Sequence, residues 1–315
     1  MNVLPLVSII IPVYNGSDYV SEAINSALDQ TYKNLEVIVI NDGSTDEGKT
    51  EEIVLSFGNR IRYYAKPNGG VSSALNLGIS VMKGEYFSWL SHDDKYEPRK
   101  IEEEVALLRQ SGHPKSIALC AHSFINSKSE HLLHQPYVHP FSNGINSWEL
   151  ALQCMLDKGT YNGCAFLIPK AAFDCCGYFH EKLRYCQDQL MWAKFFLAGY
   201  SVVYSDYPGV LSRIHGKQQT QLNRHLIRHD SEIVASIIAP QLSQLPSNNL
   251  LFVFARRNAK FNNKEALKIC HYCAQTNTPF SVTQTCQLLI TQLYGCLRPL
   301  IRKVYYMLFL RVKTR

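Results

Sequence analysis

The sequence has 315 residues, 46% hydrophobic and 18% charged, which is typical of a globular protein and excludes a largely disordered chain. Its ten cysteines form no disulfide-like pattern, and a chain of this length needs no disulfides, so we expect free thiols in a reducing compartment. Nowhere do 18 apolar residues follow one another. We therefore expect a cytoplasmic protein without a transmembrane helix.

The net charge of +6 hides an uneven distribution. Residues 241–315 contain 11 Lys and Arg but a single acid, Glu265, whereas the first 240 residues carry 21 basic and 25 acidic side chains. We expect the two parts to face different surroundings. The same basic part contains a lone CxxC pair, Cys270 and Cys273, and without a second pair a chance helix spacing is favoured over a zinc site.

The first hundred residues alternate between apolar runs and helical patterns. Apolar runs lie at residues 7–13, 35–40, 61–65 and 86–90, with helical patterns between them at 19–30, 46–57 and 71–82. This βαβ series predicts a parallel sheet flanked by helices. For the apolar amino terminus, residues 1–15, we expect a strand and not a signal peptide, because Pro5 and Pro12 interrupt it and it has no basic n-region.

Polar clusters follow three of these strands, at 14–16, 41–44 and 91–94. Ligands of parallel sheets bind outside the carboxyl ends of the strands, so the three clusters predict one crevice. Neither GxGxxG nor GxxxxGK[ST] is present, which disfavours nicotinamide and Walker-type ATP chemistry.

The third cluster contains two adjacent carboxylates, Asp93 and Asp94. Like charges held together repel, and hard oxygen ligands suit Mg²⁺ or Mn²⁺, so a cation and a bound phosphate ester are indicated. The alternative is a solvated turn before a helix that has Pro98 in its first turn.

Beyond residue 111 the pattern is mixed. We expect a strand at 117–124, a loop at 127–143, strand and turn at 161–174, a helix at 188–197, two short strands around Pro208 and Gly209 within 201–214, and helices from 222 onward. These elements predict an α/β domain at 1–220, followed by a helical, basic region at 221–315.

Several ordered motifs resemble family 2 glycosyltransferases with the GT-A fold. They are VSIIIPVYNGSDYVSEAINSALDQTYKNLEVIVINDGSTD, PNGGVSSALNLGI and the strand ending in HDD, spread over about ninety residues. The resemblance implies a Rossmann-like, mostly parallel sheet flanked by helices, with a nucleotide-binding half at 1–111 and an acceptor half at 112–220. It also implies inverting transfer of a sugar, most often from a UDP-sugar, to a hydroxyl acceptor.

The family match assigns the donor base and ribose to the first two strand ends. The matching residues are Pro12, Tyr14, Asn15 and Asp42. An aromatic ring can stack on a base, and a carboxylate can accept from a uracil N–H or a ribose hydroxyl. Purely local turn roles for Asn15 and Asp42 remain alternatives.

The glycine-containing loop with Asn68 and Gly70 matches the family's loop that approaches the sugar nucleotide. Leu75 stands where the family frequently has Arg.

The family's metal motif, DXD, matches only at its last Asp, Asp93, because Ser91 replaces the first. The resemblance implies Mn²⁺ or Mg²⁺ on Asp93, with Asp94 in support and His92 at the ribose. RIHGKQ resembles the RxHxxQ loop whose His or Arg approaches metal and diphosphate, here His215 and Arg213.

GYFHEKLRYCQDQLMW resembles the acceptor half, and Asp188 matches the catalytic base at the start of a helix. A simple first-turn or N-cap acid is the alternative. The QxxRW motif of processive synthases is absent, which favours a single-sugar transferase.

Residues 287–315 combine apolar side chains with six basic ones and no acid. Such a helix suits an anionic membrane surface and a lipid-linked or oligosaccharide acceptor of bacterial surface-glycan synthesis, such as lipopolysaccharide, at the inner face of the cell membrane. A core-packing helix with a solvated basic face is the alternative, and nucleic acid is disfavoured. Two further alternatives are a non-catalytic sugar-nucleotide-binding protein and, disfavoured because no GxGxR-like loop is present, a nucleotidyltransferase.

Overall fold

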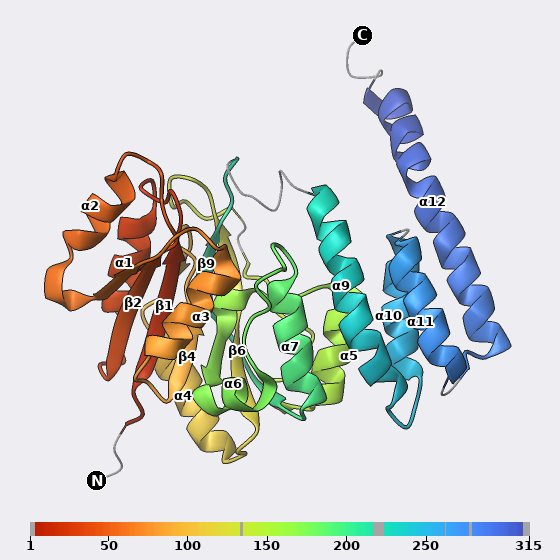
Figure 1. Cartoon of the computed structure of the whole chain (residues 1–315), viewed down its shortest axis with the longest axis horizontal. Coiled ribbons are helices and arrows are strands. Elements are labelled where there is room, and N and C mark those ends of the chain that lie inside the picture. The colour runs from red at the N-terminus through yellow and green to blue at the C-terminus, as the bar shows by residue number, and fades with distance from the viewer. Residues whose placement is uncertain (1–3, 133–134, 217–223, 262, 277–278, 311–315) are drawn as a thin grey trace. The chain divides into compact units, whose positions relative to one another are not determined.

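The computed structural model describes residues 4–132, 135–216, 224–261, 263–276 and 279–310 (Figure 1). The chain divides into two compact units, one made of Met1–Ala151 and Thr160–Arg224, the other of Leu152–Gly159 and His225–Arg315. The second unit thus includes a short segment from the middle of the chain. No feature of the sequence indicated this exchange.

The first unit is built on one mixed sheet in the order β3-β2-β1-β4-β8-β6-β9-β5, with β7 paired to β9. Its first four strands along the chain are parallel neighbours: β1 Val7–Val13, β2 Leu35–Asn41, β3 Arg62–Ala65 and β4 Tyr86–Trp89. All seven residues of β1 are buried, because helices cover both faces of a parallel sheet. The predicted βαβ series is confirmed.

The other strands make the sheet mixed. They are β5 Lys95–Tyr96, β6 Ser116–Ile125, β7 Gly144–Asn146, β8 Phe166–Pro169 and β9 Ser201–Arg213. β8 runs antiparallel between β4 and β6, β6 and β9 are parallel, and β5 and β7 pair antiparallel with β9. A curled, mostly parallel sheet flanked by helices results, as predicted (Figure 1).

The helices of the first half are α1 Val20–Leu28, α2 Lys49–Leu55, α3 Val71–Val81 and α4 Lys100–Ser111, with a 3-10 turn at Gly58–Arg60. The second half adds α5 Trp148–Lys158, a 3-10 turn at Gly163–Ala165, α6 Lys170–Cys176 and α7 Gln187–Leu197. The apolar sides of these helices supply much of the core. Phe166 and Trp192 meet there with ring centroids 4.5 Å apart.

Two sequence predictions for the second half were wrong in detail. Residues 201–213 form one strand and not two, because the irregularity at Pro208 and Gly209 is absorbed as a register shift against β6 between Cys120 and His122. Residues 170–176 are helical where a turn was expected. The loop at 127–143 makes two isolated bridges, His122 with Tyr137 and Ile125 with His131.

The second unit is helical. Besides Leu152–Gly159 it contains α9 Arg224–Ser243 from His225 onward, α10 Asn249–Lys260, α11 Lys264–Thr276 and α12 Val282–Leu310. Among the described residues, none of the helices combines the length and apolar character needed to cross a membrane. All ten cysteines are free, as predicted, and Cys270 and Cys273 are buried in α11.

Candidate active site

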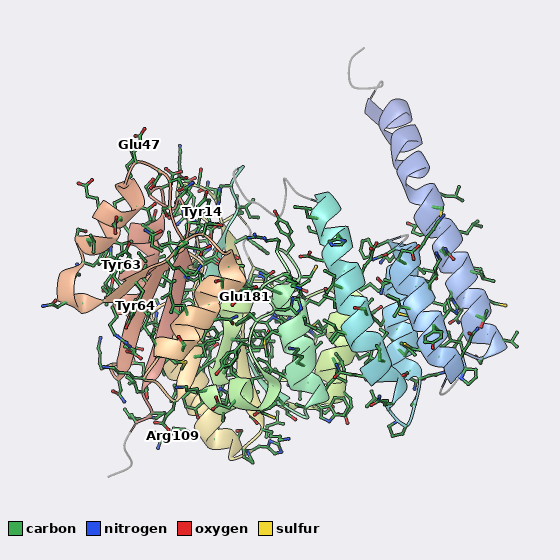
Figure 2. All side chains as sticks on the ribbon, viewed as in Figure 1. Tyr14, Glu47, Tyr63, Tyr64, Arg109 and Glu181 are labelled. Atoms are coloured by element: carbon green, nitrogen blue, oxygen red, sulfur yellow. The ribbon has the colours of Figure 1, made fainter. Side chains whose placement is uncertain are left out.

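The polar loops after β1, β2 and β4 leave the sheet at one edge. Val13 lies opposite Asn41 in the β1–β2 pair, and Ile10 lies opposite Trp89 in the β1–β4 pair. The carboxyl ends of the three strands are therefore neighbours, and the predicted crevice lies where parallel sheets bind ligands. Tyr14, labelled in Figure 2, is 43% exposed beside this edge, so its ring is available for stacking.

Asn15 fastens the first loop to the second. Its side-chain amide donates to Thr45 Oγ1 at 3.3 Å and its Oδ1 accepts from the Thr45 backbone N–H at 2.7 Å, while its own backbone N–H donates to Ser44 Oγ at 3.0 Å. The residue has a φ of 49°, a left-handed conformation that Asn tolerates better than most residues. Asn15 thus joins the first two strand-end loops, a role that the sequence did not indicate.

Asp42, at the end of β2, is buried and heavily engaged. Its Oδ1 accepts from Lys66 Nζ at 2.7 Å and from the Gly69 N–H at 3.0 Å, and its Oδ2 accepts from the Gly70 N–H at 2.7 Å. Asn68 adds a bond from its amide to the Asp42 carbonyl at 2.9 Å. A carboxylate has about four acceptor positions, so Oδ2 keeps capacity for one donor from a ligand. Asp42 therefore holds the glycine loop in place.

His92 lies against the first loop. It donates to the carbonyl of Pro12, and a Cβ atom at Gly16 would lie 2.5 Å from its ring, so only glycine fits there. Burial lowers the pKa of His92, which favours the neutral imidazole. The structure brings Pro12 and His92 together at the predicted ribose side of the crevice.

Asp93 of the third loop pairs with His215. His215 Nε2 lies 3.1 Å from Asp93 Oδ2, and the two side chains are 12% and 19% exposed, respectively. His215 follows β9, so two segments 122 residues apart in the sequence meet here. The sequence had paired these two residues, and the geometry brings them within direct contact.

Asp94, the next residue, is buried. Its Oδ1 accepts from the Arg213 backbone N–H at 2.8 Å, and its Oδ2 accepts from Cys164 Sγ and Ser212 Oγ, each at 3.5 Å. Burial, followed by the charge of Asp93, raises the pKa of Asp94 to about 7. Asp94 therefore joins β9 and the turn at Cys164 to the metal-motif loop.

Arg213 is buried, and its guanidinium contacts several protein groups. Nε donates to the Asp93 carbonyl at 2.7 Å and Nη2 to Glu22 Oε2 at 3.1 Å, while Nη1 reaches Ser129 Oγ at 3.1 Å. The cation also lies 4.4 Å from the Tyr19 ring centroid. These contacts hold the loop that carries Asp93, and the assignment of Arg213 to the diphosphate stays a prediction.

Asp188 occupies the first turn of α7. It accepts from the Gln189 N–H at 2.7 Å and from Thr160 Oγ1 at 3.3 Å, and burial raises its pKa to about 6. The carboxylate thus caps helix N–H groups and also stays basic near neutral pH. Both roles expected from the sequence, base and helix-start acid, are compatible with this geometry.

The segment between Thr160 and Cys164 connects Asp188 to the other half of the site. Asn162 bridges to Ser212 Oγ at 3.0 Å, and Cys164 Sγ contacts both Ser91 Oγ at 3.4 Å and Asp94. No sequence signal identified Thr160, Asn162 or Glu22 as site residues, because their roles depend on contacts between distant segments.

Asp93 and His215 are the residues that fit a divalent cation. Across the described part of the chain, no three His, Cys, Asp or Glu side chains gather closely enough to enclose a metal by themselves. Mg²⁺ and Mn²⁺ at nucleotide sites use one or two carboxylates and complete their coordination with phosphate oxygens and water. A carboxylate with one imidazole therefore suits a metal that arrives with a phosphate ligand.

Comparison with known proteins places the chain in a family. Residues 8–177 match the model of glycosyl transferase family 2. An uncharacterized glycosyltransferase of Rickettsia conorii is 41% identical over 273 residues, covering 84% of this chain and 44% of the relative. Another, from Rickettsia typhi, is 48% identical over 217 residues, covering 69% of this chain and 66% of the relative. The chain belongs to glycosyltransferase family 2.

The solved structures agree on the fold. The crystal structure of S. aureus TarS 1-349 in complex with UDP-GlcNAc superposes with a TM-score of 0.65 at 18% identity, covering 90% of this chain and 79% of that one. The chain spans 44% of the length of the R. conorii relative.

Proposed function

We propose that the first unit transfers one sugar from a nucleoside diphosphate sugar, in the first instance a UDP-sugar, to an acceptor hydroxyl with inversion at the anomeric carbon. The observation that carries the proposal is the pairing of Asp93 with His215 at the strand ends, joined through Asp94, Cys164 and Thr160 to the basic carboxylate of Asp188. One framework thus holds a candidate leaving-group site and a candidate base.

Asp188 acts as the base in this proposal. Its pKa of about 6 leaves the carboxylate mostly ionised at neutral pH and still basic enough to accept a proton. The acceptor oxygen attacks the anomeric carbon as Asp188 takes its proton, and the bond from that carbon to the diphosphate oxygen breaks. A single displacement of this kind needs no covalent sugar intermediate.

The donor is held by the strand-end loops. Tyr14 offers an exposed ring to the base, and Asp42 Oδ2 has room for one donor from base or ribose. Asp93 and His215 would hold Mn²⁺ or Mg²⁺, and such an ion stabilises negative charge on a departing diphosphate. Arg213 keeps the Asp93 loop in place through its bond to the Asp93 carbonyl.

The acceptor in this proposal is lipid-linked or an oligosaccharide of bacterial surface-glycan synthesis, reached at the inner membrane face. α12 supports it. The helix buries Leu288 on one side, while Leu289, Ile290 and Leu293 are 61%, 69% and 65% exposed on the other. Its sequence contains no acid. The basic side chains from Arg298 onward lie outside the described side chains, so the charge argument rests on the sequence alone.

Flotation with vesicles of anionic phosphatidylglycerol tests the membrane contact. Ile290→Glu with Leu293→Glu should reduce the bound fraction several-fold, because two charges enter the apolar face. The matched control is Leu55→Glu, a 54% exposed leucine of the first unit, which should float like the wild type. Equal flotation of all three proteins would show that the apolar face of α12 does not bind the membrane.

Calorimetric titration with UDP, GDP, dTDP and CDP, each with and without Mn²⁺, tests the donor site. We expect one nucleotide, UDP, to bind with metal dependence, and Asp93→Ala to abolish that dependence. Binding without any transfer or donor hydrolysis would favour the alternative of a non-catalytic sugar-nucleotide-binding protein. Absence of binding by all four nucleotides would overturn the proposed donor class.

A further inference from the structure

The ring of Tyr19 contacts two side chains at the carboxyl end of β9. Cζ of Arg213, the last residue of β9, lies 4.4 Å from the ring centroid, and the His215 ring lies 5.1 Å away with its plane inclined by 52°. Tyr19 is the N-cap residue of α1, in the donor half of the first unit. The ring therefore links α1 to the pair formed by His215 and Asp93.

The backbone of Tyr19 is anchored on both sides. Its N–H donates to the Gly16 carbonyl at 3.1 Å, and its carbonyl accepts from the Ala23 N–H at 3.2 Å. Gly16 is itself held, because its N–H donates to Thr50 Oγ1 at 2.9 Å and a Cβ atom there would meet the His92 ring. The ring of Tyr19 thus projects from a backbone that several hydrogen bonds keep in place.

The guanidinium of Arg213 is bound by the same helix. Its Nη2 donates at 3.1 Å to Oε2 of Glu22, which lies three residues after Tyr19 on the same side of α1. That oxygen also accepts from Ser129 Oγ at 2.6 Å and lies 3.3 Å from Lys95 Nζ. The Arg213 side chain is fully buried, and a buried cation is attracted to the face of an aromatic ring. The ion pair and the ring contact therefore hold Arg213 and Tyr19 against each other.

The His215 imidazole is bound at one nitrogen. Nε2 lies 3.1 Å from Asp93 Oδ2, whereas Nδ1 is buried and has no hydrogen-bond partner among the residues that the structure describes. A histidine that binds metal through one nitrogen usually donates its other ring N–H to a carboxylate or a carbonyl, and this bond fixes the ring. Here the packing against Tyr19 takes the place of such a bond.

We propose that Tyr19 is a positioning residue for divalent-metal binding: its ring, held by Arg213 and Glu22, orients the His215 imidazole toward Asp93. The inference rests on the proposed function and adds to that site a residue of α1 that binds neither metal nor donor itself. The ring and not the hydroxyl makes these contacts, so phenylalanine should serve at this position and an aliphatic side chain should not.

Titration of Mn²⁺ at a fixed concentration of UDP tests the assignment. Tyr19→Leu and Tyr19→Met, which lack the ring, should raise the Mn²⁺ concentration for half-maximal UDP binding by about tenfold, as expected when a metal ligand loses the partner that orients it. Their affinity for UDP without metal should stay within about twofold of the wild-type value. Tyr19→Phe should behave like the wild type.

The matched control is Phe261→Leu in the helical unit. Phe261 is 57% exposed, and Cζ of Arg257 lies 5.6 Å from its ring centroid, so the change removes an arginine–ring contact that involves no proposed ligand. The Mn²⁺ dependence of this variant should equal that of the wild type.

A double-mutant cycle with His215→Gln shows whether Tyr19 acts through His215. In the His215→Gln background Tyr19→Leu should have no further effect on the Mn²⁺ dependence, because the side chain that it orients is gone. An undiminished tenfold effect in that background would contradict the assignment. So would a loss in Tyr19→Phe as large as in Tyr19→Leu, since the ring would then not be the cause.

The remaining outcomes separate this inference from the proposed function. An unchanged Mn²⁺ dependence in Tyr19→Leu would overturn the role of Tyr19 and leave the donor site standing. An equal loss of UDP affinity with and without metal would mean that Tyr19 only supports the first loop. If the wild type binds UDP without any metal dependence, or binds no nucleotide, the metal site or the donor class itself is wrong, and the inference is overturned with it.

Discussion

The buried carboxylate of the donor half and the carboxylate of the acceptor half are held in different ways. Asp42 is 3% exposed and accepts three short bonds from Lys66, Gly69 and Gly70, whereas Asp188 is partly exposed and accepts bonds at 2.7 and 3.3 Å from one helix N–H and one hydroxyl. The first carboxylate holds the glycine loop before α3 in place. The second keeps a raised pKa and thus the ability to move a proton.

The largest expected effect comes from Asp188→Asn. The amide keeps the shape and an acceptor oxygen for the Gln189 N–H but cannot take a proton, so kcat should fall by about a thousandfold, within the range of general-base contributions. Donor affinity and the melting temperature should change little. The exposed Asp174→Asn is the matched control. Retention of more than a tenth of the wild-type kcat would show that Asp188 is a helix-start acid only.

Asp42→Asn tests the other carboxylate, the one that holds the glycine loop in the donor half. Because the neutral amide breaks the ion pair with Lys66 and turns one acceptor into a donor, we expect the free energy of unfolding to fall by about 2 kcal/mol. Urea denaturation measures this change. Lys66→Met should lower the free energy of unfolding by a similar amount. If Asp42→Asn is as stable as the wild type, the glycine loop does not depend on the bonds of Asp42.

The pH dependence of kcat should follow Asp188. Since the base must be ionised and its pKa is about 6, kcat should rise about tenfold per pH unit below 6 and level off above it. Donor affinity, measured over the same range, identifies any contribution from other groups. A kcat that does not change between pH 5 and 7 would show that Asp188 is not the base.

The smallest effect is expected for Asp94→Asn. Burial and the Asp93 charge already push this carboxyl toward its protonated form, and an amide oxygen can still accept from the Arg213 N–H. The free energy of unfolding at pH 7 should therefore stay within about 1 kcal/mol of the wild-type value, less than the loss in Asp42→Asn. If the free energy of unfolding fell more in Asp94→Asn than in Asp42→Asn, this prediction would be wrong.

The sequence predicted the first half of the fold well, because apolar runs and helical spacing are strong signals in a βαβ series. It did not predict the two-residue strand β5 or the transfer of 152–159 to the second unit, since both depend on contacts between distant segments. The predicted site residues at the strand ends do lie together. Periodicity could not tell that Asp94 and Arg213 are buried, because β9 decides both.

The segment 152–159 has a consequence for how such enzymes can be shortened or recombined. Asp157 pairs with Arg256 at 2.6 Å, and the Met155 carbonyl accepts from Arg257 at 3.3 Å, both within the second unit. Ending the chain at residue 224 would leave these groups and the buried Leu152 and Leu156 without their partners. A chimaera that exchanges the helical unit for that of a relative should therefore carry two inserts, one near residue 155 and one after 224, and not a single terminal graft.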